Sequence, residues 1–355
     1  MTFLESVRRR QDDYPPYYEA PTGEHKRYDQ NVNLLGPHPA ASQGVDLSNA
    51  HLYPNRDNRP LLEALARAFS LDWHHYWVGN GSDEILDLAF RLFLEPGQRL
   101  VTATPTYSMY PHLARLNRVA YVGVPTNDDF QITASKLLAQ KPDMVLVCNP
   151  NNPTGTLFDP RLVGEILEAF DGPVLVDEAY AEFAGMTLIS LVDKYPNLLV
   201  ARTLSKAYGL AGLRVGFGVA HPDVAELLRR AKPPFTVNIA SEQVAVRALA
   251  DRRPVDQAIR AIGQERDRLT KGLRDLGFNV WPSHANFVLT LPPIPCEELY
   301  AKLKDRHILA RLYRHEPALR DHIRFTVGTP EDTKTLLSAL EKVLEEGEEE
   351  EVDPL

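Results

Sequence analysis

The chain has 355 residues, of which 44% are hydrophobic and 25% are charged, and this composition excludes a wholly disordered protein. Its length favours two domains, since single domains usually contain ~100–200 residues. The formal net charge is −9, but residues 345–355 alone carry seven acidic side chains and no basic one. The rest of the chain is therefore nearly neutral, and we expect neither a nucleic acid nor a membrane as partner.

The two cysteines, Cys148 and Cys296, lie too far apart for a CxxC metal site and are too few for a disulfide framework. We expect no metal site and a reducing, cytoplasmic compartment. Residues 1–14 are too charged for a signal peptide. The longest uncharged stretch, residues 276–296, contains four prolines and is therefore not expected to form a membrane helix.

Short apolar runs alternate with amphipathic segments through the middle of the chain, which is typical of a mostly parallel sheet covered by helices on both faces. The segments expected as strands are 76–78, 99–103, 144–148, 174–176, 198–201 and 215–219. The segments expected as helices in this region are 85–92, 107–116 and 162–170.

The pattern changes after Pro254, where long helices with polar faces become frequent. Helices are expected at 257–276, 297–306 and 330–346, with strands at 286–291 and 323–327. This mixture predicts a second, smaller α+β domain. Residues 1–45 are rich in proline and tyrosine without a clear period, so we expect an arm on the surface. The acidic residues 345–355 are expected to form a disordered tail.

Polar residues follow five of the expected strands directly, and the carboxyl ends of strands are where open α/β sheets bind ligands. These residues are Gly79-Asn80-Gly81-Ser82-Asp83, Pro105-Thr106-Tyr107, Asn149 to Gly155, Asp177 to Tyr180, and Thr203 to Lys206 with Arg214. They combine a glycine-rich turn, an aromatic ring, an amide, a carboxylate and a lysine at one edge of the sheet.

Each of these features alone has a common structural explanation. Gly79 and Gly81 fit any tight turn and lack the third glycine of a dinucleotide fingerprint, so a nicotinamide dehydrogenase is disfavoured. Asp177 could cap a helix, and a single lysine such as Lys206 is usually a solvated surface group. Only the combination indicates catalysis.

Several strings occur together in a fixed order, and they span residues 14–344. They are Tyr53-Pro54, Gly79 to Glu84, Pro105 to Tyr110, Asn151 to Gly155, Val176 to Tyr180, Thr203 to Lys206, Gly212 to Gly216 and Ile323 to Thr329. They resemble the fold-type I pyridoxal-phosphate (PLP) enzymes of the class I/II aminotransferase superfamily. Within that superfamily, their residues and their order are similar to those of histidinol-phosphate aminotransferases.

The resemblance implies an α/β fold with a mostly parallel, seven-stranded sheet in a large PLP-binding domain and a smaller α+β domain. The implied boundaries are 1–45 for the arm and part of the small domain, 46–253 for the large domain, 254–344 for the small domain, and 345–355 for the tail. It also implies a homodimer with shared active sites.

The resemblance further implies how PLP is held. Lys206 binds the cofactor covalently, Asp177 faces its ring nitrogen, and Tyr180 with Asn152 faces its ring oxygen. Lys206, Asp177 and Tyr180 are therefore the expected catalytic residues. Tyr107 is expected to stack on the ring. The residues implied to bind the phosphate are Gly81, Ser82, Asp83, Thr203, Ser205 and Arg214, together with Tyr53 of the second subunit.

The substrate site implied by the resemblance takes a small amino donor and a 2-oxo acid, here histidinol phosphate and 2-oxoglutarate. Its expected residues are Arg324, Arg311, Tyr17 and Asn33. Val32 and Leu34 depart from the family pattern, in which a glutamate and a proline are usual. An aminotransferase for aromatic or other amino acids, or a phosphothreonine-type PLP decarboxylase, therefore stays open. A non-catalytic regulator or scaffold with the same fold is a further alternative, which the intact Lys206 and Asp177 disfavour.

Overall fold

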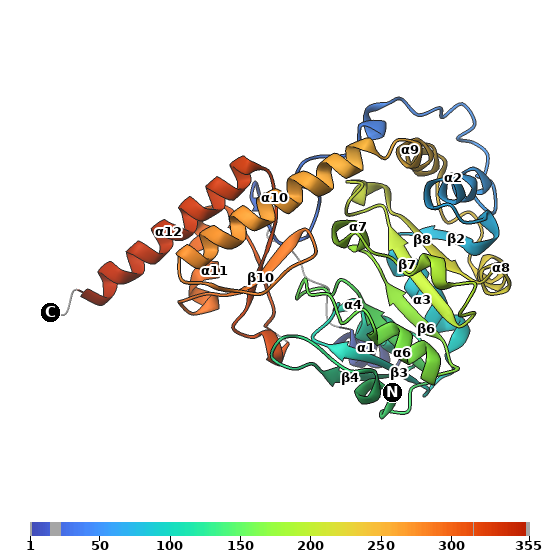
Figure 1. Cartoon of the computed structure of the whole chain (residues 1–355), viewed down its shortest axis with the longest axis horizontal. Coiled ribbons are helices and arrows are strands. Elements are labelled where there is room, and N and C mark those ends of the chain that lie inside the picture. Colours follow the sequence, from blue (N-terminus) through green and yellow to red (C-terminus); the bar gives the residue numbers. More distant parts are fainter. Residues whose placement is uncertain (1, 15–22, 315, 353–355) are drawn as a thin grey trace.

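The computed structural model describes residues 2–14, 23–314 and 316–352. Its largest element is a seven-stranded sheet with the order β2-β8-β7-β6-β5-β3-β4 (Figure 1). The strands are β2 (Tyr76–Asn80), β3 (Arg99–Thr104), β4 (Ala120–Pro125), β5 (Met144–Cys148), β6 (Val174–Asp177), β7 (Leu198–Thr203) and β8 (Val215–Ala220). Only β8 runs antiparallel to its neighbours, β2 and β7. The predicted mostly parallel α/β sheet is confirmed.

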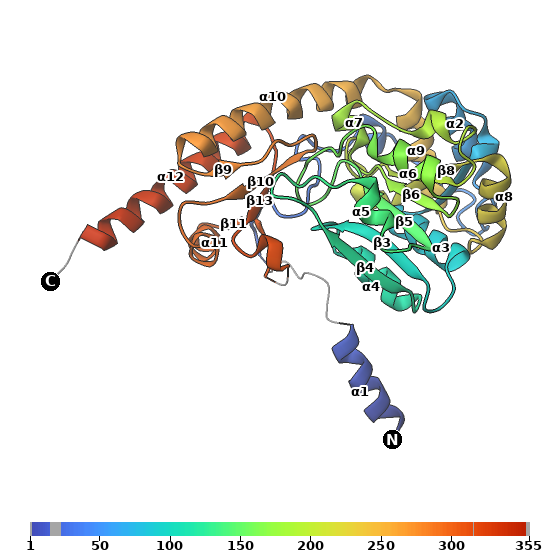
Figure 2. The same cartoon turned by 60° about the horizontal axis from the view of Figure 1, so that its bottom comes forward.

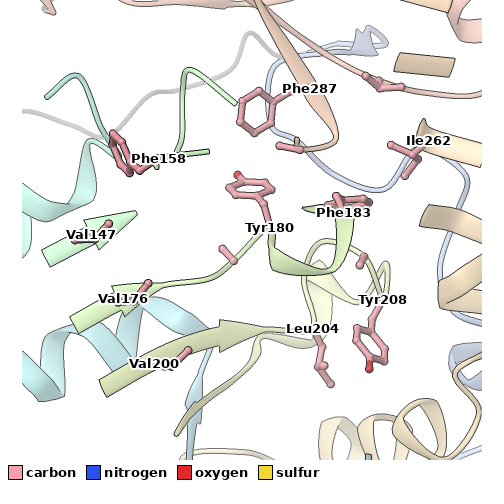
Figure 3. Packing of buried hydrophobic residues seen from close by; sticks show 14 of the residues in the cluster. Val147, Phe158, Val176, Tyr180, Phe183, Val200, Leu204, Tyr208, Ile262 and Phe287 are labelled. Carbon is pink, nitrogen blue, oxygen red and sulfur yellow. The ribbon is translucent and has the colours of Figure 1, made fainter. Parts of the chain in front are cut away.

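The central strands are apolar on both faces because helices cover both sides of the sheet. Along β6, Val174 and Val176 belong to one buried cluster and Leu175 to another. Figure 3 shows Val147, Val176 and Val200 on the first of these faces. That face is covered by α2 (Arg59–Phe69), α5 (Ala134–Leu138), α6 (Leu162–Ala169) and α9 (Ile239–Ala250). The other face is covered by α3 (Ser82–Phe93), α4 (Met109–Leu116) and α8 (Pro222–Ala231).

A smaller antiparallel sheet follows in the chain, with the order β12-β13-β10-β9. Its strands are β9 (Asn279–Val280), β10 (Phe287–Leu291), β12 (Arg311–Leu312) and β13 (Ile323–Thr326), and the helices nearby are α10 (Arg253–Asp275), α11 (Cys296–Asp305) and α12 (Pro330–Val352). The long helix α10 runs between the two parts of the molecule (Figure 2). The expected boundary between residues 253 and 254 falls in the first turn of this helix.

The N-terminal part of the chain returns to the part of the molecule that holds the smaller sheet, and it forms a separate two-stranded sheet there. Strand β1 (Lys26–Arg27) pairs in parallel with β11 (Ile308–Leu309). Residues 28–33 then pass from the smaller sheet toward the large one, since Asn31 bonds both Thr326 and Tyr180. This crossing segment brings residues near the chain start into contact with the ends of β6 and β7.

Two terminal segments differ from expectation. Helix α1 (Phe3–Asp13) forms where no period was evident, and a reciprocal cap explains its start: the Glu5 N–H donates to Thr2 Oγ1 at 3.2 Å and the Thr2 N–H to Glu5 Oε2 at 2.7 Å. Helix α12 continues to Val352, so residues 345–352 are helical rather than disordered. Glutamate favours helices, and adding residues to an anchored helix avoids the cost of nucleation.

None of the helices in the described part of the chain combines the length and the apolar character needed to cross a membrane.

Candidate active site

A cavity of about 270 Å³ lies at the carboxyl ends of β3, β5, β6 and β7. Strands β12 and β13 and residues 29–32 contribute its other walls. Many of the residues predicted from the sequence line it, namely Ser82, Asp83, Tyr107, Asn152, Asp177, Tyr180, Thr203, Ser205, Lys206, Arg214, Arg311 and Arg324. The fold thus brings both predicted groups, the cofactor residues and the two substrate arginines, to one place.

Asp177 ends strand β6 as a buried carboxylate whose side chain is held by two neutral donors. Tyr110 Oη donates to its Oδ2 at 2.7 Å, and the Ala179 N–H donates to its Oδ1 at 3.1 Å. Burial raises the pKa of Asp177 to about 6, although both hydrogen bonds oppose that shift. A carboxylate in this position is well suited to a positively charged partner in the cavity.

Lys206 follows β7 by three residues and points its amine at the crossing segment. Its Nζ donates to the backbone oxygens of Gln30 at 3.3 Å and Asn31 at 3.2 Å. Burial, with a further contribution from the charge of Arg324, lowers the pKa of Lys206 to about 8. A larger fraction of this amine is therefore neutral near pH 7 than for an ordinary lysine, and the neutral amine is the nucleophile.

Asn152 and Tyr180 lie between the lysine and the smaller sheet. Arg324 Nη1 donates to Asn152 Oδ1 at 2.6 Å, so the amide NH₂ is the group of Asn152 that can donate into the cavity. The hydroxyl of Tyr180 accepts from Asn31 Nδ2 at 3.1 Å and can itself donate. Figure 3 shows Tyr180 facing Phe287, whose ring it meets edge-on at 5.1 Å. Burial raises the pKa of Tyr180, which keeps its proton in place.

The opposite end of the cavity is suited to an anion. Helix α3 begins after Gly81, and the first N–H groups of a helix have no partners within it. Gly81 has a φ of +80°, and a Cβ there would lie 2.4 Å from Arg214 Nη2. A larger residue would therefore displace the arginine. Arg214 Nη2 itself lies 3.0 Å from Asp83 Oδ2.

Hydroxyl groups complete the anion end. Thr203 Oγ1 donates to Ser205 Oγ at 2.9 Å, and both residues line the cavity. Tyr107 Oη donates to Asp83 Oδ1 at 3.2 Å. N–H groups, hydroxyls and a guanidinium together match the acceptor oxygens of a phosphate group.

Two of the predicted residues lie elsewhere. Tyr53 is 81% exposed and stacks on Phe235 with ring centroids 4.7 Å apart, away from the cavity wall. The side chain of Asn33 bonds backbone groups, donating to Ala207 O at 3.2 Å and accepting from the Leu35 N–H at 3.1 Å. Asn33 therefore does not line the cavity, whereas Asn31, two residues earlier, does. Tyr17 lies outside the described residues.

Two residues of the site were not predicted, namely Tyr110 behind the cavity wall and Asn31 within it. Tyr110 lies three residues after Tyr107, which precedes α4, and that spacing is the signal that could have placed the two rings close together. Asn31 adopts a φ of 53°, a conformation in which asparagine is enriched. Its contacts with Thr326 and Tyr180 depend on the crossing of the chain, which no local pattern reveals.

Comparison with known proteins agrees with this geometry. Residues 29–340 match the family described as aminotransferase class I and II. This chain belongs to that family. The prediction of a PLP-dependent aminotransferase, made from the strings around the cavity, is confirmed at the level of the family.

Several similar proteins are named histidinol-phosphate aminotransferase. The chain is 34% identical to histidinol-phosphate aminotransferase 1 of Trichormus variabilis, covering 93% of this chain and 96% of the relative. It is 36% identical to histidinol-phosphate aminotransferase of Dehalococcoides mccartyi, covering 88% and 89%. The crystal structure of histidinol-phosphate aminotransferase from Sinorhizobium meliloti in complex with pyridoxal-5'-phosphate superposes with a TM-score of 0.85 at 26% identity, covering 98% of this chain and 95% of that chain.

Proposed function

We propose that the chain transfers the amino group of histidinol phosphate to 2-oxoglutarate, with PLP held in the cavity. The observation that carries the choice of donor is a pair of arginines. Arg311 of β12 lies directly opposite Arg324 of β13, and both line the cavity. Like charges directly opposite on a sheet repel each other, whereas a shared dianionic group such as a phosphate would neutralise both.

The residues of the cavity fit PLP. When bound, PLP withdraws electrons from the donor's reacting carbon and makes its proton acidic. Lys206 would hold the cofactor through its amine and accept that proton at Nζ. Asp177 would hold the protonated ring nitrogen, and Asn152 and Tyr180 would donate to the ring oxygen. The anion end formed by the start of α3, Thr203, Ser205 and Arg214 would bind the phosphate of the cofactor.

The arginine pair gives a test of the donor. We expect Arg311→Ala to lower kcat/KM for histidinol phosphate by about 10- to 100-fold, as for the loss of a hydrogen bond to a charged group. The same change should barely affect unphosphorylated aromatic amino acids, because their single carboxylate carries one charge and needs only Arg324. Arg314→Ala is the matched control, because Arg314 lies near in sequence but pairs with Glu297 on the surface.

A screen of amino donors would also separate the alternative functions. A wild-type preference for an unphosphorylated aromatic or aliphatic donor, unchanged by Arg311→Ala, would assign a different amino donor, and Val32 in the cavity wall would then be the first residue to examine. Release of carbon dioxide from phosphothreonine would indicate a decarboxylase. Absence of turnover with every donor would support a scaffold role.

We also propose a homodimer in which Tyr53 contacts the cofactor phosphate of the partner subunit. Large apolar side chains are exposed near this residue: Leu47, Leu52 and Phe235, as well as Tyr53 itself. Such clusters often mark interfaces, and Tyr53 does not line the cavity of its own chain. Co-expression of a Lys206→Ala chain with a Tyr53→Phe chain should yield heterodimers with one intact site. Activity no higher than the sum of the two separate variants would contradict shared sites.

We also propose that the chain is a cytoplasmic enzyme. Cys148 and Cys296 are both free thiols in the structure. This state fits a cytoplasmic enzyme in a reducing environment. Fractionation of cells that express the natural chain would test the location.

A further inference from the structure

Tyr110 occupies a special position behind the cavity. It lies in α4 and is fully buried, with an exposed fraction of 0%. Its hydroxyl donates to Asp177 Oδ2 at 2.7 Å, and its ring meets that of Tyr107 edge-on at 5.5 Å. The tyrosine thus connects α4, which begins directly after the lining residues Tyr107 and Ser108, to the carboxylate of Asp177.

The two oxygens of Asp177 are held from different elements. Oδ2 is bonded by Tyr110 from α4, and Oδ1 by the Ala179 N–H from the loop after β6. A carboxylate has about four acceptor positions on its two oxygens. Two fixed donors therefore leave capacity for a third donor while they limit rotation of the group.

We propose that Tyr110 is a positioning residue that keeps the Asp177 carboxylate ionised and oriented toward the cavity. This proposal rests on the function proposed above in one respect: the oriented carboxylate would hold the protonated ring nitrogen of PLP. Without the hydroxyl, Asp177 would lose a donor that favours its charged form, in a place where water cannot replace it.

The other groups around Asp177 do not substitute for this hydroxyl. Cys148 of β5 lies beside it, but burial raises the pKa of that thiol to about 12, so it is neutral. The charge of Asp83 on α3 raises the pKa of Asp177, and the charge of Lys206 lowers it. Burial also raises the pKa of Tyr110 well above its ordinary value, so the tyrosine stays the donor.

The test compares two buried tyrosines. Tyr110→Phe removes the hydroxyl and keeps the ring. Tyr76→Phe is the matched control, because Tyr76 is also 0% exposed and its hydroxyl has no hydrogen-bond partner among the described residues. The readout is the pKa of Asp177 in the cofactor-free protein, from ¹³C NMR with labelled aspartate carboxyls, and Asp177→Asn identifies the resonance.

We expect the pKa of Asp177 to rise by about one unit or more in Tyr110→Phe, as expected for loss of a hydrogen bond to a charged group. It should stay unchanged in Tyr76→Phe. A tyrosine with a fluorinated ring at position 110, which is a stronger donor, should lower the pKa below the wild-type value. A purely structural role for Tyr110 would produce no such graded response.

An unchanged pKa of Asp177 in Tyr110→Phe would overturn the positioning role, and so would a fluorinated ring that leaves it unmoved. Either result is distinct from failure of the proposed function. If wild-type protein bound no PLP, the aminotransferase proposal would fail, while the response of Asp177 to the three substitutions at positions 110 and 76 would still decide the role of Tyr110.

Discussion

Asp177 and Glu178 are consecutive acidic residues, both buried, and their surroundings differ. Glu178 accepts from Arg202 Nη1 at 3.2 Å, from Thr187 Oγ1 at 2.5 Å and from the Leu188 N–H at 2.6 Å. Arg202 also bonds Glu182 at 2.7 Å. Asp177 is held by two neutral donors and borders the cavity. A buried carboxylate that is paired within the fold indicates a structural role, whereas one that lacks a directly bonded cation is available to a ligand.

The largest effect is expected from removing Arg202, the cation that pairs with Glu178 and Glu182. Arg202→Met leaves Glu178 and Glu182 buried without their cation, and removal of one partner of such a cluster typically costs about 3–5 kcal/mol. Denaturant titration should show this loss in the free energy of unfolding, while turnover per folded molecule stays near wild type. A triple variant that also carries Glu178→Gln and Glu182→Gln should recover most of the loss. A stable Arg202→Met protein would contradict the structural role.

The opposite response is expected at Asp177. Its pKa is raised from 3.8 to about 6 in the folded protein, so the charged form is disfavoured by folding. Asp177→Asn removes that charge and should stabilise the cofactor-free protein at pH 7 by roughly 2–3 kcal/mol. Turnover should nevertheless fall at least about tenfold, equivalent to ~1.4 kcal/mol. Loss of both stability and activity would place Asp177 with Glu178 as a structural group.

The pH dependence of stability sharpens this contrast. Between pH 3.8 and about 6 the folded protein binds more protons at Asp177 than the unfolded chain does, so its contribution to stability falls as the pH rises through this window. Urea titrations at several pH values should show this fall in the free energy of unfolding for the cofactor-free wild type but not for Asp177→Asn. Curves that stay parallel across the window would show that Asp177 titrates normally.

A smaller effect is expected at the edge of the structural cluster. Thr187→Val removes the hydroxyl that donates to Glu178 and keeps a similar volume. The expected loss in the free energy of unfolding is about 1–2 kcal/mol, because Arg202 and the Leu188 N–H still bond the carboxylate. Activity should not change. A loss as large as that of Arg202→Met would mean that the hydroxyl, rather than the arginine, holds Glu178.

The sequence predicts those residues whose position follows from a strand end. Asp177 comes directly after an apolar run and Lys206 follows another within a few residues, and the parallel sheet places both at one edge. The long helices and the central strands are predictable for the same reason, since their apolar periods are strong. Strand β4 is not predictable in this way, because Ala120–Pro125 has one buried residue, with the others exposed or half-buried, and contains a glycine and a proline.

Contacts made by distant segments could not be predicted in this way. The roles of Asn31 and Asn33 depend on how the crossing segment turns at Asn31, and a shift of two residues changes which side chain faces the cavity. Tyr110 was read only as part of a motif, because its bond to Asp177 joins a helix to a strand 67 residues away. The cap of α1 formed by Thr2 and Glu5 is local, and its spacing of three residues is a signal that the sequence does contain.

The central claim is that Lys206 is the amine that holds PLP, and one measurement tests it most directly. The PLP-loaded protein is reduced with borohydride, and its peptides are mapped by mass spectrometry. Lys232 is the internal comparison, because it is also buried and burial lowers its pKa, but it does not line the cavity. We predict an adduct on Lys206 and none in Lys206→Ala. An adduct on Lys232 or any other lysine of the wild-type protein would contradict the claim.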